Sequence, residues 1–267
     1  MAEQQDVISA LTAKGDQVDG WVAGLDESGW ARPTPATGWT VAHQIAHLSF
    51  IFKLAGTAAS DPETFKVMAA RAGDDFDAAV NGALGLYLPA EPAELLERWR
   101  TERTDAIKAL DALPRTEIVP WLVRPLPAFV LASAGIMELF GHGQDIADAL
   151  GVTPVRTDGL KHLVLFATLT WDFGYQARGL TAPDTQFRFE ITAPSGALWE
   201  FGPDDSTERI SGSAEDFCLL VTRRRHHSDL DVVATGAEAT RWLEIAQAYR
   251  GPAGEGRRPG QFPKAGR

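Results

Sequence analysis

The stretch GIMELFGHGQDIAD, residues 135–148, decides the fold of the N-terminal half of the chain. It lies within a helix predicted over about residues 128–150, which Gly151 would end. Glu138 and His142 are four residues apart, so on a helix they point the same way, one turn above the other. The rest of that face is apolar or small. We therefore predict a helix whose core-facing stripe carries a carboxylate and an imidazole.

Two such side chains are costly to bury unless a partner satisfies them. A divalent metal would do so, and a carboxylate–imidazole pair at this spacing is a natural half-site for one. The alternative is an ordinary Glu–His hydrogen bond on a solvated helix face. Gly141 and Gly143 each cost a helix about 1 kcal/mol against alanine, which suggests close backbone approach or access to a site.

A second helix, predicted from the N-cap Thr40 to about residue 58, carries His47 on another core-like face. His47, Glu138 and His142 together leave open positions for water or substrate, as catalytic metal sites require. We predict that these three residues bind a divalent metal. Zinc suits the ligands best, and nickel, iron or manganese fits in part.

Three further residues are candidates for a catalytic role. His43, one turn before His47, would be a fourth ligand, a proton shuttle or a surface or capping residue. Asp145, one turn beyond His142, would orient a ligand imidazole or be a solvated acid. Arg223, in the basic run 223–225, would fix a substrate carboxylate by bidentate hydrogen bonds or belong to a solvated turn.

Apolar spacing predicts three more helices in the first half of the chain: near residues 4–25, after Pro62, and from near Pro92 to Leu113. The loop 114–127 contains four prolines and cannot be helical throughout. The first 155 residues therefore read as a helix bundle.

After residue 155 the pattern changes to that of a smaller α/β domain over 156–250, so the fold class is α+β. Residues 158–179 read as one helix and 186–192 with 197–201 as a hairpin. A third strand over 207–211, a helix from the Ser213 cap to about Arg223 and a last helix over 236–249 follow. The Gly-, Pro- and Arg-rich segment 251–267 is predicted to be a flexible tail.

Composition excludes several function classes. Lys and Arg total 25 against 36 Asp and Glu, a net charge of −11, which would repel nucleic acid. No segment approaches the roughly 18 apolar residues of a membrane span, and the polar N-terminus does not read as a secretory signal. We therefore expect a cytoplasmic protein, monomer or homodimer, with a small-molecule substrate. The single cysteine, Cys218, lies in an apolar run and reads as a buried core residue, so a reactive thiol would come from outside.

Paired motifs resemble a known family. The run Gly38 to Leu48, together with Glu138 to Gly151, resembles the DinB-like metal-binding family. It is more similar still to the actinobacterial branch related to mycothiol-dependent maleylpyruvate isomerase. Segments 216–226 and 242–252 also look like that branch, so the resemblance covers nearly the whole chain.

The resemblance implies a DinB-type four-helix bundle with zinc or a similar ion on His47, Glu138 and His142, followed by a smaller, sterol-carrier-like α/β domain. His43 departs from the family pattern, in which this position is usually acidic. The resemblance also implies that a low-molecular-weight thiol, usually mycothiol, serves as cofactor or co-substrate in isomerisation or S-transfer.

We hypothesise that the metal lowers the pKa of the thiol, and that the thiolate adds to a small electrophilic substrate. Two other classes stay open. A metal-dependent hydrolase would use bound hydroxide and need no thiol. A non-catalytic protein would only bind a ligand, with a structural metal.

Overall fold

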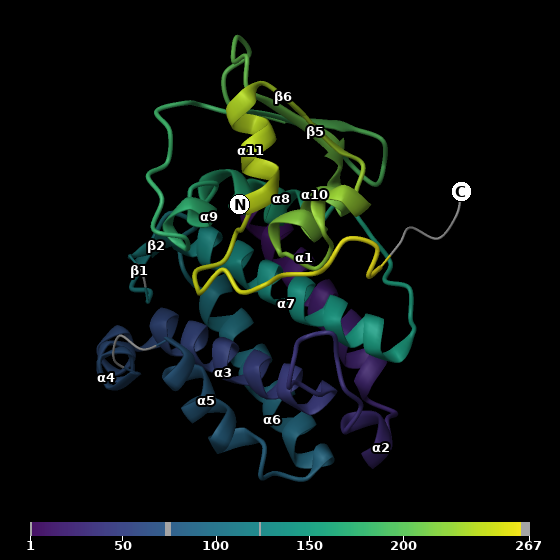
Figure 1. Ribbon diagram of the computed structural model, residues 1–267. Coiled ribbons are helices and arrows are strands. Elements are labelled where there is room, and N and C mark those ends of the chain that lie inside the picture. Colours follow the sequence, from purple (N-terminus) through teal and green to yellow (C-terminus); the bar gives the residue numbers. More distant parts are fainter. Residues whose placement is uncertain (1, 73–75, 123, 263–267) are drawn as a thin grey trace. The chain divides into compact units, whose positions relative to one another are not determined.

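The computed structural model describes residues 2–72, 76–122 and 124–262, and the chain divides between Pro154 and Val155 into two compact units (Figure 1). The first unit is helical apart from a short hairpin, and the second combines helices with a four-stranded sheet. The protein is thus a mixed helix-and-sheet protein. No helix in the described ranges is long and apolar enough to cross a lipid bilayer.

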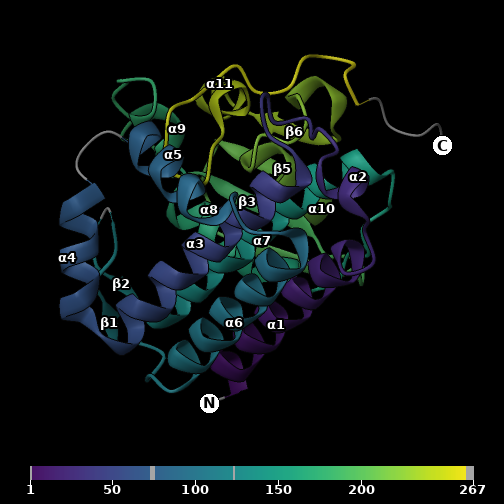
Figure 2. The ribbon, with the colours of Figure 1, turned by 90° about the horizontal axis from the view of Figure 1, so that it is seen from below.

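Four long helices make up most of the first unit: α1 (Ala2–Val22), α3 (Val41–Ser60), α6 (Pro92–Asp111) and α7 (Ala128–Leu150). Helices α1 and α3 each pack against both α6 and α7, and Figure 2 shows α1, α6 and α3 running side by side. Large side chains that are 2% exposed or less fill the space between them: Leu11, Ile45, Trp99, Leu131 and Phe140. These helices confirm the four predicted from the same apolar stripes.

Shorter elements complete the first unit: α2 (Glu27–Trp30), α4 (Pro62–Ala72), α5 (Phe76–Tyr87), β1 (Ile118–Val119) and β2 (Leu126–Pro127). The single helix predicted after Pro62 is wrong, because α4 and α5 are separate helices on either side of residues 73–75, which lie outside the described ranges. The proline-rich loop contains the β1–β2 hairpin. Helix α2 was not predicted; its cap is the Asp26 carboxylate, which accepts from the Gly29 N–H at 2.8 Å.

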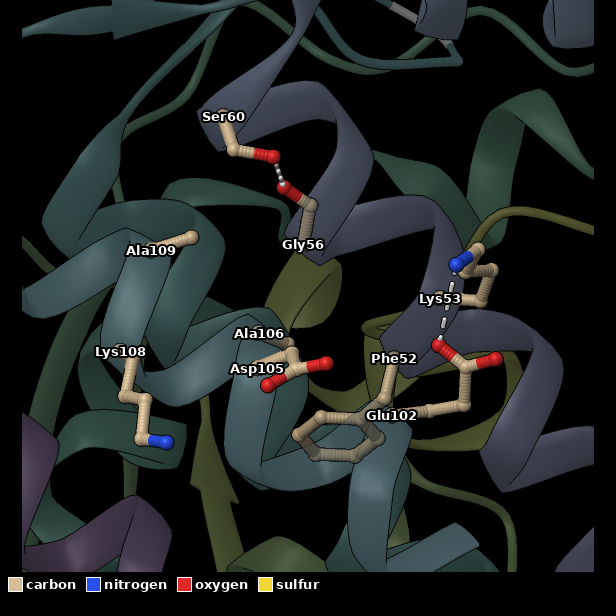
Figure 3. A pocket seen from close by; sticks show the side chains of 9 residues that line it. All are labelled: Phe52, Lys53, Gly56, Ser60, Glu102, Asp105, Ala106, Lys108 and Ala109. Atoms are coloured by element: carbon tan, nitrogen blue, oxygen red, sulfur yellow. Dashed lines mark hydrogen bonds and ion pairs between the residues drawn. The ribbon is translucent and has the colours of Figure 1, made fainter. Parts of the chain in front are cut away.

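Helices α3 and α6 approach each other closely at Gly56. A Cβ on Gly56 would lie 3.1 Å from the Ala106 Cα, so the backbone of α6 occupies the space of a side chain. Figure 3 shows this contact beside a groove of about 300 Å³, which the Lys53–Glu102 ion pair crosses. The missing side chain therefore sets the distance between the two helices.

The second unit is built on a mixed sheet of β3 (Arg188–Thr192), β4 (Leu198–Phe201), β5 (Arg209–Ser213) and β6 (Val232–Thr235). The strand order is β4-β3-β5-β6, with β3 parallel to β5 and the other two pairs antiparallel. Helices α8 (Leu160–Leu169), α10 (Ala214–Val221) and α11 (Ala237–Ile245) contact its strands. Aromatic side chains form the core between them: Phe187, Phe189, Phe217 and Trp242. The predicted hairpin is confirmed, and the Ser213 hydroxyl caps α10 as predicted.

The helix predicted over 158–179 is wrong as a single element. It ends at Leu169, and a separate turn, α9 (Phe173–Gln176), follows. The Trp171 carbonyl accepts a hydrogen bond from the Trp242 indole N–H at 2.8 Å, so a tertiary contact uses a group that helix continuation would need. The last helix ends at Ile245 and not near residue 249, because the Ile245 carbonyl accepts from the Arg178 guanidinium.

Strand β6 and the 3₁₀ turn His227–Asp229 were not predicted. In the expected tail, residues up to 262 contact the second unit. The Gly260 N–H donates to the Asp229 carboxylate at 2.9 Å, and the Arg225 guanidinium lies 4.3 Å from the centre of the Phe262 ring. The flexibility expected for residues 251–267 stays a prediction.

Replacing Gly56 by valine should lower the free energy of unfolding by about 1–3 kcal/mol, because the added methyl groups would meet the α6 backbone. The matched control is Gly20→Ala in α1, where nothing lies within 4 Å of an added Cβ. That change should raise the free energy of unfolding by about 0.5–1 kcal/mol through helix propensity. Denaturant titration measures both, and a loss in the control as large as in Gly56→Val would contradict the interpretation.

Candidate metal centre

Three side chains from two packed helices converge in the first unit. Helix α3 supplies His47, and α7 supplies Glu138 and His142 from consecutive turns of one face. Glu138 Oε2 lies 3.6 Å from His47 Nε2 and 3.3 Å from His142 Nε2. In the described ranges these residues form the one group of three or more His, Cys, Asp or Glu whose ligand atoms all lie within 4.8 Å of one another.

These distances fit a metal. Ligand atoms at about 2.0–2.1 Å from a tetrahedral zinc lie about 3.3–3.4 Å from one another. His47 is buried and the other two residues are partly buried, so water reaches the three side chains only in part. The sequence-predicted ligands are thus brought together. Glu138 and His142 do make the contact that the alternative expected, but on a partly buried face that they share with His47.

The Glu138 carboxyl group is ionised in this setting. Burial raises its pKa, but hydrogen bonds and charge attraction from His142 and His47 outweigh burial and hold the pKa below its ordinary value. A carboxylate between two imidazoles is the charge state that a divalent cation requires.

Trp39 covers the imidazoles. Its ring is stacked on that of His142 at a centroid distance of 5.9 Å and an interplanar angle of 19°. It also lies 5.5 Å from the His47 ring. Sequence reasoning missed this residue, because nothing in its spacing relates it to the ligands.

His142 is held at its other nitrogen by a residue that sequence reasoning also missed. Its Nδ1 lies 2.6 Å from the amide oxygen of Gln44, which is fully buried on α3. The signal in the sequence was weak: Gln44 is a polar residue three positions before His47, followed by apolar Ile45 and Ala46.

His43 caps helix α3. Its Nδ1 accepts from the Thr40 N–H at 3.3 Å and lies 2.9 Å from the Thr40 hydroxyl. This is a capping box in which histidine takes the place of the usual Glu or Gln. Burial lowers the pKa of the His43 imidazole. The capping alternative therefore describes what this residue does in the structure.

Asp145 and Arg223 lie on different units. Asp145 is fully buried on α7, one turn beyond His142, so the solvated-acid alternative is wrong. Arg223 follows α10 in the second unit, with φ at +57°, a left-handed conformation that favours glycine. Its N–H donates to the Leu220 carbonyl, and the next N–H, of Arg224, donates to Leu219, the pattern of a Schellman cap.

Comparison with known proteins gives two family matches. Residues 11–147 match the mycothiol maleylpyruvate isomerase N-terminal domain, and residues 183–235 match a domain described as wyosine base formation. The first range includes all three candidate ligands.

Two relatives from Mycobacterium tuberculosis, of strains CDC 1551 / Oshkosh and ATCC 25618 / H37Rv, are each 42% identical over 257 residues, which is 96% of this chain and 100% of the relative. Both are uncharacterised. Among solved structures, the mycothiol-dependent maleylpyruvate isomerase matches with a TM-score of 0.56 and 16% identity, over 86% of this chain and 92% of that one. A histidine-to-alanine mutant of it matches with a TM-score of 0.54 and 16% identity over the same shares. These structures show a shared fold.

The His43 cap should weaken as the pH falls. Protonation removes the Nδ1 acceptor, and a lowered folded-state pKa means that the unfolded chain takes up the proton more readily. The cap therefore contributes stability above about pH 6.5, the ordinary histidine value, and loses it as the pH falls through the folded-state pKa. Thermal unfolding of the wild type and of His43→Gln, whose side chain keeps an acceptor, should diverge between pH 7.5 and 5.5 in favour of the variant. Parallel melting temperatures across this range would contradict the assignment.

Proposed function

Because the chain belongs to the family of the mycothiol maleylpyruvate isomerase N-terminal domain, we propose that it is a divalent-metal-dependent enzyme. It would activate a low-molecular-weight thiol of the mycothiol type for isomerisation or S-transfer on a small electrophilic substrate. The observation that carries the proposal is the convergence of two imidazole nitrogens and one carboxylate within 4.8 Å. Relation to a thiol-dependent isomerase makes the thiol the natural co-substrate.

His47, Glu138 and His142 would hold the metal. Three protein ligands leave a coordination position for an outside group, whereas a structural zinc site is usually closed by four. When bound, the metal supplies Lewis acidity that lowers the pKa of a coordinated thiol. Zinc suits two imidazoles and a carboxylate best.

The thiol has to come from outside the chain. Cys218 is fully buried in α10 of the second unit, and it is the only cysteine in the sequence. For isomerisation the thiol would add to and leave the same carbon, so that the substrate gains and loses no atoms overall. In S-transfer the new carbon–sulfur bond would be kept.

Arg223 is proposed to bind a substrate carboxylate. It lines a cavity of about 110 Å³ together with Arg225, His226 and Arg257. One of its terminal nitrogens, Nη1, is buried and has no hydrogen-bond partner among the described residues. A guanidinium with an unused donor offers an anion a charge-assisted hydrogen bond.

Two further residues keep proposed roles at the metal. Asp145, buried one turn beyond His142, would orient a ligand imidazole. His43 would relay a proton through Nε2, because its Nδ1 is used by the cap. The four long helices are inferred to be a DinB-type bundle, and the second unit a sterol-carrier-like domain.

The same open site would also serve a hydrolase that uses bound hydroxide. The two classes differ in one requirement, because the hydrolase turns over its substrate without a thiol. A protein that only binds a ligand would turn over no substrate in either condition.

Metal analysis of the purified protein tests the site. The wild type should hold one equivalent of a divalent metal, and His47→Ala and Glu138→Gln should lose it. His43→Gln, a matched change on the same helix, should retain it.

The metal-loaded wild type should convert a conjugated acid only with mycothiol present, and the metal-free protein should not. Stoichiometric metal in both His47→Ala and Glu138→Gln would refute the metal site, and turnover without a thiol would refute the thiol mechanism.

Two replacements of Arg223 separate its function from its conformation. Arg223→Gly and Arg223→Ala both remove the guanidinium, so each should raise KM for a carboxylate substrate by about ten- to a hundred-fold. The glycine variant should be more stable than the alanine variant by about 1 kcal/mol, because only glycine adopts a left-handed φ without strain. Steady-state kinetics and denaturant titration measure both effects. Unchanged KM values would refute the proposed anion contact.

A further inference from the structure

We propose that Gln44 is a positioning residue for the metal centre. It would fix His142 in the tautomer that presents the Nε2 lone pair to the metal, and Thr34 would fix the orientation of Gln44 itself. The inference rests on the proposed function, because it concerns how the same ligands are held.

The contacts form an unbroken chain. His142 Nδ1 lies 2.6 Å from Gln44 Oε1, and Gln44 Nε2 lies 2.9 Å from the Thr34 hydroxyl oxygen. The Thr34 hydroxyl in turn donates to the Trp39 carbonyl at 2.9 Å. Each of these groups is therefore hydrogen-bonded to the next, from His142 through Gln44 and Thr34 to the Trp39 carbonyl.

The hydrogen bonds in this series all run in one direction, from donor to acceptor. A hydroxyl carries one proton, and that of Thr34 is given to the Trp39 carbonyl, so its oxygen accepts from whatever Gln44 presents. Gln44 must therefore turn its NH₂ to Thr34 and its carbonyl oxygen to His142. An acceptor at that distance requires a proton on His142 Nδ1. In the neutral imidazole the lone pair is then on Nε2, the atom 3.3 Å from Glu138.

Burial makes this arrangement stringent. Gln44 is 0% exposed, so water cannot replace a lost partner of its amide. Reversing the amide would set the NH₂ against the Nδ1 proton and the carbonyl against the Thr34 oxygen. In metal sites, partners of this kind orient the ligand imidazole and raise its basicity.

Thr34 and Trp39 lie on one hydrogen-bonded turn before α3. The Thr34 N–H donates to the Trp39 carbonyl at 2.8 Å, and the Trp39 N–H donates to the Ala36 carbonyl at 2.9 Å. A β-bridge joins Pro33 to Thr40 across the same turn. The turn thus holds His142 twice, at the ring face through Trp39 and at the ring edge through Gln44.

Gln44→Leu and Gln44→Glu separate positioning from structural support. Leucine keeps the buried volume but offers no acceptor, so affinity for Zn²⁺ should fall by about ten- to a hundred-fold. Glutamate keeps an acceptor for Nδ1, so affinity should stay within about threefold of the wild type, whereas its buried charge should lower the melting temperature of the metal-free protein. Affinity and stability would therefore rank the two variants in opposite order.

The measurement is competition for Zn²⁺ alone against a chromogenic chelator, with melting temperatures taken without metal. Thr34→Val, which releases the Gln44 amide, should weaken Zn²⁺ binding by a smaller factor than Gln44→Leu. Ser49→Ala removes another buried hydroxyl from α3, one that donates to Ile45, and should leave affinity unchanged.

Each remaining outcome is decisive. Unchanged affinity in Gln44→Leu, or equal losses in the leucine and glutamate variants, would overturn the positioning role. A wild type that binds no Zn²⁺ would instead overturn the proposed function. Nitrogen-15 NMR of the Zn²⁺-loaded protein adds an independent reading, because His142 should keep its proton on Nδ1 and bind the metal through Nε2; a metal-bound Nδ1 would overturn the inference.

Discussion

The close approach of two imidazoles to one ionised carboxylate is the constraint on which the candidate site depends. Two imidazoles and an ionised carboxylate meet within 4.8 Å, with His47 buried and the other two side chains partly buried. Such a set is tolerated only if a cation or protons lie between the ligand atoms. The packing of α3 against α7 and the hydrogen bond that His142 donates to Gln44 both favour one arrangement, in which the candidate ligand atoms face one another.

Close helix contacts at two glycine positions make that arrangement possible. Gly56 lets α3 approach α6, and Gly143 lets α7 approach α1, since a Cβ there would lie 3.0 Å from Val18. The helix-propensity cost foreseen for Gly143 is thus explained by packing against α1. These contacts set how closely α3 packs on α6 and α7 on α1, and metal coordination tolerates only small errors in ligand position.

Sequence reasoning singled out the candidate ligands because they differ in chemistry from the apolar stripes that carry them. Glu138 and His142 stand at helical spacing, and His47 lies on a second apolar stripe. Three polar groups on core-facing stripes need a partner, which led to the prediction of a metal site. Gln44 and Trp39 escaped notice, because an amide and an indole have ordinary uses in a core and their contacts depend on a turn that periodicity does not describe. The break after Leu169 escaped for a similar reason: its cause is a tertiary hydrogen bond between Trp171 and Trp242.

The distance along the chain between the two histidine ligands has a consequence for synthesis and folding. Position 47 emerges from the ribosome long before position 142, so the nascent N-terminal helices contain no complete site. The site exists only after a long loop has closed, and the entropy of that closure opposes early assembly. A metal that binds only the closed form would stabilise the native state by mass action without trapping partly made chains. Metal supply would then set how long the finished protein survives, while leaving the early steps of its folding untouched.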